Sequence, residues 1–165
     1  MMPDRPEWLP DILCVDGEYR QVVAALYEVF QRDIKTSRLT LAGSQVWWDR
    51  RVLPGETYEE GFWHLITRKN WKTGQREHDP RRAERLSWCA PAIQHCSEPV
   101  VKLWDYEESD GKIRTYLWLE DFHYVILFEK RMQKKGPVAF MVTAYYVDND
   151  GTRKSFQRKY EKRRP

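Results

Sequence analysis

A length of 165 residues predicts a single domain, 1–165, with a core that needs neither disulfides nor a metal ion to fold. An aromatic content of 14% predicts a folded chain, and 32% charged residues predict a chain that does not span a membrane. Residues 1–10 hold no apolar signal segment and the three cysteines lack metal-ligand spacing, so we expect a cytoplasmic protein. The net charge of +3 is uneven, because residues 1–60 carry 7 Lys/Arg against 11 Asp/Glu and residues 61–165 carry 21 against 14, which favours an anionic partner for the second part.

The acidic part, residues 1–60, is predicted to form a helix followed by a hairpin. Residues 18–32 place apolar side chains on one stripe at three-to-four spacing, and Asp16 is a suitable N-cap. Residues 38–51 alternate apolar and polar side chains around a turn at Gly43 and Ser44, which is typical of a hairpin.

The middle of the chain is predicted to hold a second helix between less regular segments. Residues 62–68 predict a short strand or turn, and the polar residues 70–80 predict a loop. Residues 81–96 predict the helix, and Pro91 is expected to kink or divide it.

From residue 100 the apolar pattern changes to a period of two. Strands are predicted at residues 101–107, 112–120, 124–130 and 138–147. Their short links, such as Asp110-Gly111, join only antiparallel neighbours. We therefore expect an α+β fold: an N-terminal helix and hairpin, a second helix, then a four-stranded antiparallel meander sheet with one face free for a ligand.

The chain ends in a basic C-terminal tail. Residues 152–165 carry seven Lys/Arg and a single acidic residue, Glu161, which suits a polyanion; a tail that only solvates the terminus is the alternative. Within this tail, residues 155–163 predict either a last strand or a short helix.

Common catalytic motifs are missing from the sequence. The glycines stand singly, Ser87 and Cys89 have no nucleophile-elbow flanks, and Cys89, His95 and Cys96 do not complete a metal set, so we expect no metal and no cofactor. His64 lies in an apolar segment and can act as an acid or base near neutral pH. The alternative is a half-buried histidine that is hydrogen-bonded to backbone.

Two pairs of polar residues suit a phosphate group. Arg82 and Arg85 are three apart and are predicted to share a helix face; pairing with neighbouring carboxylates is the alternative. Thr143 and Tyr145 are two apart in the last strand and point to one face; packing of Tyr145 at the sheet edge is the alternative. With the histidine and the tail, this set fits metal-free RNA cleavage, in which the ribose 2′-hydroxyl attacks and the protein supplies a base, an acid and cations.

Four segments in this order resemble phage-type members of the Barnase–EndoU–colicin–RelE (BECR) nuclease superfamily: Phe62-Trp63-His64-Leu65-Ile66-Thr67, Arg82-x-x-Arg85-Leu86-x-Trp88, Tyr124-Val125-Ile126-Leu127 and Val142-Thr143-Ala144-Tyr145-Tyr146. The resemblance covers about residues 61–160 and does not clearly include residues 1–60. It implies a nuclease-like core, 61–165, with helices before a four-stranded antiparallel sheet. It also implies a metal-independent endoribonuclease of the toxin type that acts on tRNA or mRNA at the exposed sheet face.

The resemblance also implies roles for individual residues. The catalytic candidates are His64 as base or acid, and Arg85, Thr143 and Tyr145 at the phosphate. The RNA-binding candidates are Arg68, Arg82 and Lys159. Barnase-like members use a glutamate as base, which has no clear equivalent here; Glu120 and Glu129 are the candidates.

Two functions of other classes stay open. The aromatic surplus and the basic tail also suit a nucleic-acid-binding module without catalysis. The acidic residues 1–60, with Trp47, Trp48 and Trp63 nearby, also suit an antitoxin or immunity-type interaction partner, or a surface that receives such an inhibitor.

Overall fold

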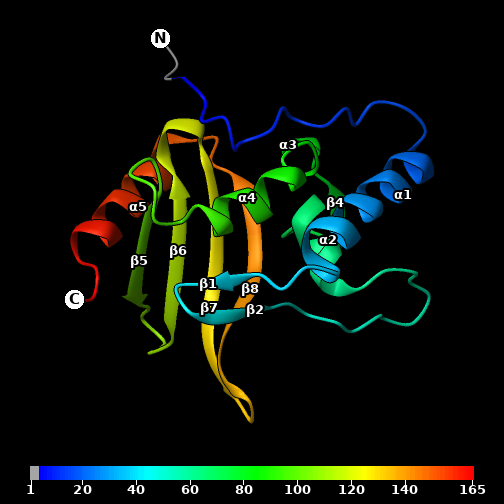
Figure 1. The fold of residues 1–165 in the computed structure, drawn as a ribbon. Helices are drawn as coiled ribbons and strands as arrows, with labels where there is room; N and C mark the ends of the chain where they lie inside the picture. The colour runs from blue at the N-terminus through cyan, green and yellow to red at the C-terminus, as the bar shows by residue number, and fades with distance from the viewer. Residues whose placement is uncertain (1–3) are drawn as a thin grey trace.

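The computed structural model describes residues 4–165, which form helices packed on a curled sheet (Figure 1). The helices are α1 (Tyr19–Phe30), α2 (Glu60–Ile66), α3 (Pro80–Ala83), α4 (Cys89–Gln94) and α5 (Asp150–Glu161), with a π-helical turn η1 (Gln31–Lys35) and 3-10 turns η2 (Leu86–Trp88) and η3 (Glu120–Phe122). The strands are β1 (Thr40–Leu41), β2 (Ser44–Trp47), β3 (Thr67–Lys69), β4 (Arg76–His78), β5 (Lys102–Glu107), β6 (Ile113–Leu119), β7 (Tyr124–Gln133) and β8 (Gly136–Tyr146).

The main sheet has the strand order β1-β2-β8-β7-β6-β5, and β3 pairs with β4 apart from it. The expected α+β class is confirmed, and β5 to β8 are consecutive antiparallel neighbours. The expected four-stranded sheet is wrong, because the N-terminal hairpin adds β2 parallel to β8, with Trp47 beside Phe140. This pairing supplies hydrogen-bond partners to an edge that β8 would otherwise expose.

The helical prediction for residues 18–32 and the hairpin after it are confirmed, with Glu18 rather than Asp16 as the N-cap of α1. The prediction of a strand or turn at residues 62–68 is wrong for most of that segment, which forms α2. Buried Phe62, Leu65 and Ile66 follow the three-to-four spacing of a helix face, which a short apolar run conceals.

The segment predicted as one helix, residues 81–96, is divided into α3, η2 and α4. The break falls at residues 84–85 and not at Pro91, which lies in the first turn of α4, where a missing N–H costs little. Residues 70–80 are not loop throughout, because β4 pairs with β3. Residues 155–163 lie largely in α5, so the helix is the correct alternative.

Two apolar clusters hold the sheet. The larger one lies between α1–α4 and the face that carries Tyr124, Ile126 and Phe128. On the opposite face α5 covers β5 and β6 through Phe156, whose ring lies 5.7 Å from Tyr116 (Figure 1). The expectation of a free second face is therefore correct only for the half of the sheet that α5 leaves uncovered.

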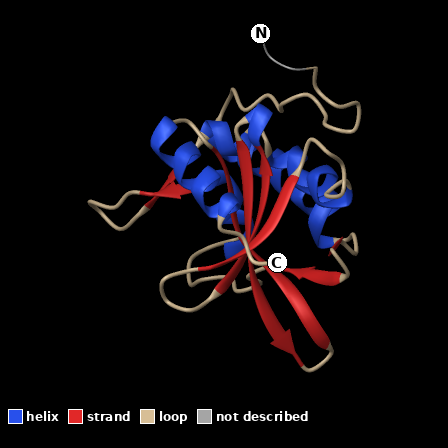
Figure 2. Cartoon of the chain, turned by 90° about the vertical axis from the view of Figure 1, so that its left-hand side faces the viewer, coloured by secondary structure: helices blue, strands red, loops and turns tan. Residues whose placement is uncertain are grey.

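The ends of β7 and β8 form a hairpin that projects beyond the helices (Figures 1 and 2). Within residues 4–165 there is no helix whose length and apolar character together would let it cross a bilayer. Cys14, Cys89 and Cys96 are free thiols, and burial raises the pKa of Cys89 to about 12.

Candidate functional site

A cavity of about 750 Å³ lies on the open half of the sheet, where α2, α3 and the β3–β4 hairpin meet β8. His64 comes from α2, Arg82 from α3 and Thr143 from β8. Four of the predicted site residues line this one cavity, from segments up to 79 residues apart: His64, Arg68, Arg82 and Thr143.

A bulge in β8 aims Thr143 into the cavity. Leu127 pairs with Thr143 and Phe128 with Met141, so Val142 is an extra residue in β8. Met141 and Ala144 therefore both face the helices, whereas Val142 and Thr143 both line the cavity. The shared face of Thr143 and Tyr145 agrees with the prediction. Strict alternation would place Val142 on the other face with Ala144, because alternation cannot anticipate the bulge.

Arg82 links the end of α2 to β8 through hydrogen bonds. Its Nη1 donates to the backbone oxygen of Thr67 at 2.8 Å, to Oγ1 of Thr143 at 3.1 Å and to the backbone oxygen of His64 at 3.2 Å. Oγ1 of Thr143 also donates to that His64 oxygen at 3.2 Å, and Arg76 donates from Nε to Oγ1 of Thr67 at 2.7 Å. The arginines therefore satisfy C-terminal carbonyls of α2 and hold His64 beside β8.

The charge of the cavity is strongly positive. Its lining carries one carboxylate, Glu77, and five cationic side chains: Arg68, Lys69, Arg76, Arg82 and Arg114. Among residues 4–165 no carboxylate oxygen lies within 4.0 Å of the charged nitrogens of Arg68, Arg76 or Arg114. The Nε of Arg114 is buried without a hydrogen-bond partner in the described chain. Such unpaired guanidinium groups suit an anion, and phosphate fits their planar donor geometry.

His64 is half-buried, and its pKa lies below the ordinary value of 6.5. Burial is the main cause, and the positive charge of Arg76 adds to it, while Asp49 acts in the opposite direction. The backbone of Val142 also acts in the opposite direction. Because the pKa lies below 6.5, the imidazole is mostly neutral at pH 7, and its unprotonated nitrogen can accept a proton.

Tyr145 borders the cavity through Arg82, whose guanidinium carbon lies 5.2 Å from the centre of its ring. Burial raises the pKa of Tyr145, although Arg82 and Arg114 lower it in part. The hydroxyl therefore stays protonated near neutral pH and can act only as a donor or a neutral acceptor.

Arg85 does not line the cavity. Because α3 ends at Ala83, Arg82 and Arg85 do not share a helix face, and that prediction is wrong. Arg85 donates to Glu84 at 2.5 Å, and its guanidinium carbon lies 4.4 Å from the centre of the Tyr146 ring. Arg85 is therefore paired with Glu84 and packed against Tyr146.

Lys159 also lies away from the cavity, on α5. Its Nζ is 3.0 Å from Oε2 of Glu108 and donates to the hydroxyl of Tyr116 at 2.8 Å. The two glutamates considered as bases are likewise engaged elsewhere: Glu120 accepts from Lys102 at 2.8 Å, and Glu129 lies 3.7 Å from Lys112.

The carboxylate beside His64 is Glu60, whose Oε2 lies 3.4 Å from Nε2 of the imidazole. The sequence signal is their spacing of four residues, which brings side chains together only on a helix. Arg76, Arg114 and Trp71 were also missed. Trp71 is 86% exposed in the β3–β4 turn, and a tryptophan within so polar a segment was its signal.

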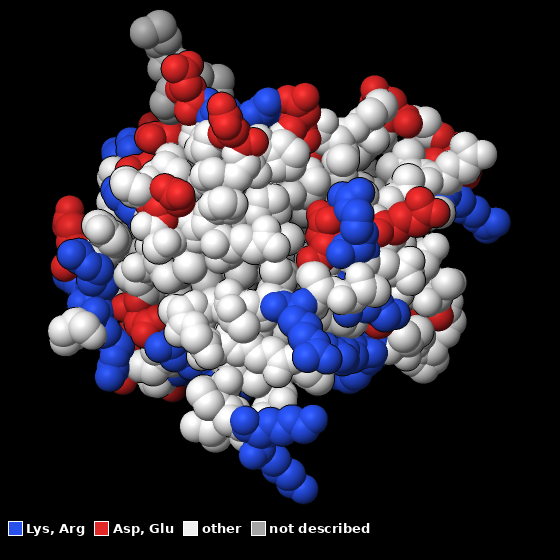
Figure 3. Space-filling view, in the orientation of Figure 1, with Lys and Arg blue, Asp and Glu red and all other residues white. Residues whose placement is uncertain are grey.

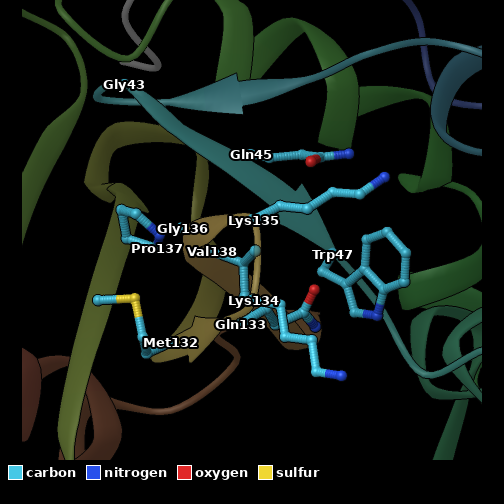
Figure 4. A pocket seen from close by; sticks show the side chains of 10 residues that line it. All are labelled: Gly43, Gln45, Trp47, Met132, Gln133, Lys134, Lys135, Gly136, Pro137 and Val138. Carbon is cyan, nitrogen blue, oxygen red and sulfur yellow. The ribbon is translucent and has the colours of Figure 1, made fainter.

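A second cavity, of about 770 Å³, lies between β2 and the β7–β8 hairpin (Figure 4). The residues that line it include Gln45, Trp47, Lys134 and Lys135, and no histidine or carboxylate. Of these two cavities, only the one that holds His64 is lined by side chains that can take up or release a proton near neutral pH. In the described part of the chain, no three His, Cys, Asp or Glu side chains gather in a way that could hold a metal ion.

Comparison with known proteins gives no assignment: no family model matches the sequence, and no curated protein or solved structure matches the chain. The chemistry of the cavity is therefore the main indication of function, beside the resemblance of four segments to BECR nucleases.

Proposed function

We propose that this protein is an endoribonuclease of the toxin or phage-effector type that cleaves tRNA or mRNA in the cytoplasm without a metal ion. One observation carries the proposal: the half-buried imidazole of His64, with its lowered pKa, and the half-buried hydroxyl of Thr143 lie in one cavity with five cationic side chains. The order of the four BECR-like segments supports the same function.

The proposed reaction uses the substrate's own nucleophile. His64 takes the proton from a ribose 2′-hydroxyl, whose oxygen attacks the adjacent phosphorus and forms a bond to it. The bond from phosphorus to the 5′-oxygen breaks, and that oxygen leaves with a proton from an acid of the site or from water. Arg76, Arg82 and Arg114 stabilise the extra negative charge on the phosphate, and Thr143 and Tyr145 orient it through their hydroxyls. The products are a 2′,3′-cyclic phosphate and a 5′-hydroxyl end.

A second candidate function is RNA binding without cleavage. Trp71 favours it, because an exposed indole with the Lys69 ammonium 5.2 Å from its ring centre is a suitable platform for a base. The protein-partner hypothesis has weaker support, because Trp48 is buried in the core and Trp47 lies beneath the Arg50 guanidinium. Trp48 is therefore closed to a partner, and at Trp47 a partner would meet the Arg50 guanidinium that stacks on the indole.

The test is incubation of the protein with total RNA in EDTA, with His64→Ala in parallel, followed by separation on a denaturing gel. New discrete bands that disappear with His64→Ala support the proposal, and cyclic phosphate at their 3′ ends identifies 2′-hydroxyl attack. Intact RNA together with salt-sensitive binding would favour the second candidate. Equal cleavage by both proteins would show that His64 is not the base.

A further inference from the structure

A strip of stacked arginine and aromatic side chains continues the open face of the sheet beyond the cavity. It consists of Trp47 and Arg50 at the end of β2 and of Arg131 and Phe140 on β7 and β8. The guanidinium carbon of Arg50 lies 3.5 Å from the centre of the Trp47 ring, and that of Arg131 lies 3.7 Å from the centre of the Phe140 ring. We call these four residues the basic strip.

The register of the sheet places the strip next to the cavity. Trp47 and Phe140 are direct partners across β2 and β8, so their side chains lie together. Phe140 precedes the bulge residue Val142 by two positions on β8, and Val142 lines the cavity. At about 3.3 Å per residue, the strip begins roughly 7 Å from the cavity.

A hollow of about 550 Å³ lies over the strip, which puts its side chains within reach of a ligand. Beyond Trp47 the second cavity continues to the hairpin, where Figure 4 shows Lys134 and Lys135 beside the β2 residues. Lys and Arg side chains gather over β2 and the end of the hairpin in Figure 3.

Two carboxylates limit the positive charge of the strip. Asp49 is held by Arg51, with 2.7 Å between Oδ2 and Nη2. Glu129 lies between Lys112 and Arg131, at 3.7 and 3.6 Å. Arg50, Lys134 and Lys135 have no carboxylate oxygen within 4.0 Å in the described chain. The strip and hairpin therefore keep a net positive charge.

We propose that the basic strip binds the single-stranded RNA that flanks the cleaved phosphate, so that the substrate is an extended strand and not a duplex. An arginine plane stacked on an aromatic ring offers one flat face to a base and its edge donors to a phosphate. A regular duplex hides its base faces, whereas an unpaired strand presents them. This inference rests on the proposed RNA substrate and adds its form and the path of its flanking nucleotides.

The test measures binding and cleavage separately. A fluorescent single-stranded RNA of about 12 nucleotides, within the range of known single-strand sites, is titrated with His64→Ala protein by anisotropy. Adding Arg50→Ala and Arg131→Ala should weaken binding about tenfold and reduce the salt dependence by about one released counterion for each lost phosphate contact. A double-stranded RNA of equal length should bind weakly and lose little affinity with the same substitutions.

The matched control is the His64→Ala protein with Arg20→Ala and Lys154→Ala, which removes the same charge from exposed positions on α1 and α5. Equal losses in the two double variants, or equal binding of duplex and single strand, would overturn the inference. Cleavage is then measured in protein that retains His64, with and without Arg50→Ala and Arg131→Ala. RNA cleavage that does not depend on the strip would refute the inference and leave the proposed function standing. Strip-dependent binding of single-stranded RNA without any cleavage would refute the proposed nuclease and leave the strip as a single-strand binding site.

Discussion

One face of the sheet carries two clusters of cationic and aromatic side chains that differ in how their charges are balanced. Under α5, the Lys159 ammonium meets Glu108 and Tyr116 among packed aromatic rings. Where α5 does not reach, Arg68, Arg76 and Arg114 lie around an open cavity without a carboxylate partner in the described chain. The residue types are similar, but only the second cluster lacks internal compensation.

Charge compensation separates a structural cluster from a candidate binding site in a basic protein. A partly buried charge costs free energy unless it is paired. In the α5 cluster Glu108 compensates the charge of Lys159, which is the arrangement expected of a structural contact. The cationic groups of the cavity have no such compensation within the described chain, which is the arrangement expected of a binding site for an anion. Each substitution below changes one of the two clusters and should leave the other intact.

The largest effect is expected for His64→Ala, because it removes the proposed base from the open cavity. General base catalysis typically contributes about 10²–10⁴-fold, so kcat/KM for RNA cleavage should fall by that factor. The unfolding temperature should change little, because His64 is only half-buried. His95→Ala is the control: this histidine stacks on Trp8 at 4.7 Å, away from the cavity, and its removal should leave cleavage unchanged.

Phe156→Ala is expected to have the next largest effect, on stability. The side chain is 5% exposed and joins α5 to the aromatic residues of the sheet. Truncation of a buried phenylalanine costs about 3–5 kcal/mol in the free energy of unfolding, which urea denaturation measures. The packing is then lost between α5 and the half of the sheet that α5 covers. A loss below about 1 kcal/mol would show that α5 is not held by this contact.

Arg114→Gln tests the opposite property of the open cavity. The substitution removes a charge that has no carboxylate within 4.0 Å in the described chain, so stability should stay the same or rise slightly. Cleavage should fall about tenfold to hundredfold if Arg114 contacts the phosphate in the transition state. Steady-state kinetics and thermal unfolding of one preparation measure both, and a loss of stability without loss of rate would contradict the assignment.

The pH dependence sharpens the role assigned to His64. Its pKa lies below 6.5 because of burial and Arg76, so kcat/KM should rise with pH along a limb whose midpoint lies below pH 6.5. Arg76→Gln removes one of these causes and should shift that limb to higher pH by less than about one unit. The unfolded imidazole binds a proton more readily than the folded one, so stability should fall as pH drops from 6.5 through the folded pKa. NMR titration of the His64 ring checks the assignment.

The periodicity of apolar residues predicted those elements in which a single spacing runs through the whole segment. The stripe in residues 18–32 and the two-residue period after residue 100 gave α1 and the strands β5 to β8. The parallel pairing of β2 with β8 joins residues about 90 positions apart, and no local pattern specifies it. Helix α2 was not predicted, because its short apolar run also fits a strand.

The candidate site was predicted in part for the same reason. His64, Arg68, Arg82 and Thr143 carry recognisable chemistry, and the cavity brings them together. Arg114 and Glu60 could not be selected, because their relevance depends on the register of β6 and on the helical state of α2. Charged residues are common, and only tertiary structure shows which of them lack a partner.

The smallest effect is expected for Lys159→Met, which removes the cation of the α5 cluster and keeps its apolar stem. The Lys159 and Glu108 side chains are 26% and 16% exposed, so the lost pair should lower the free energy of unfolding by about 1 kcal/mol or less. RNA cleavage should stay within about twofold of the parent, since Lys159 is compensated by Glu108 and does not line the cavity. A matched Glu108→Gln variant should lose similar stability, because it breaks the same pair from the other side. A tenfold loss of cleavage with unchanged stability in Lys159→Met would instead make the α5 cluster part of the RNA site, and charge compensation would then fail to distinguish the two halves of this face.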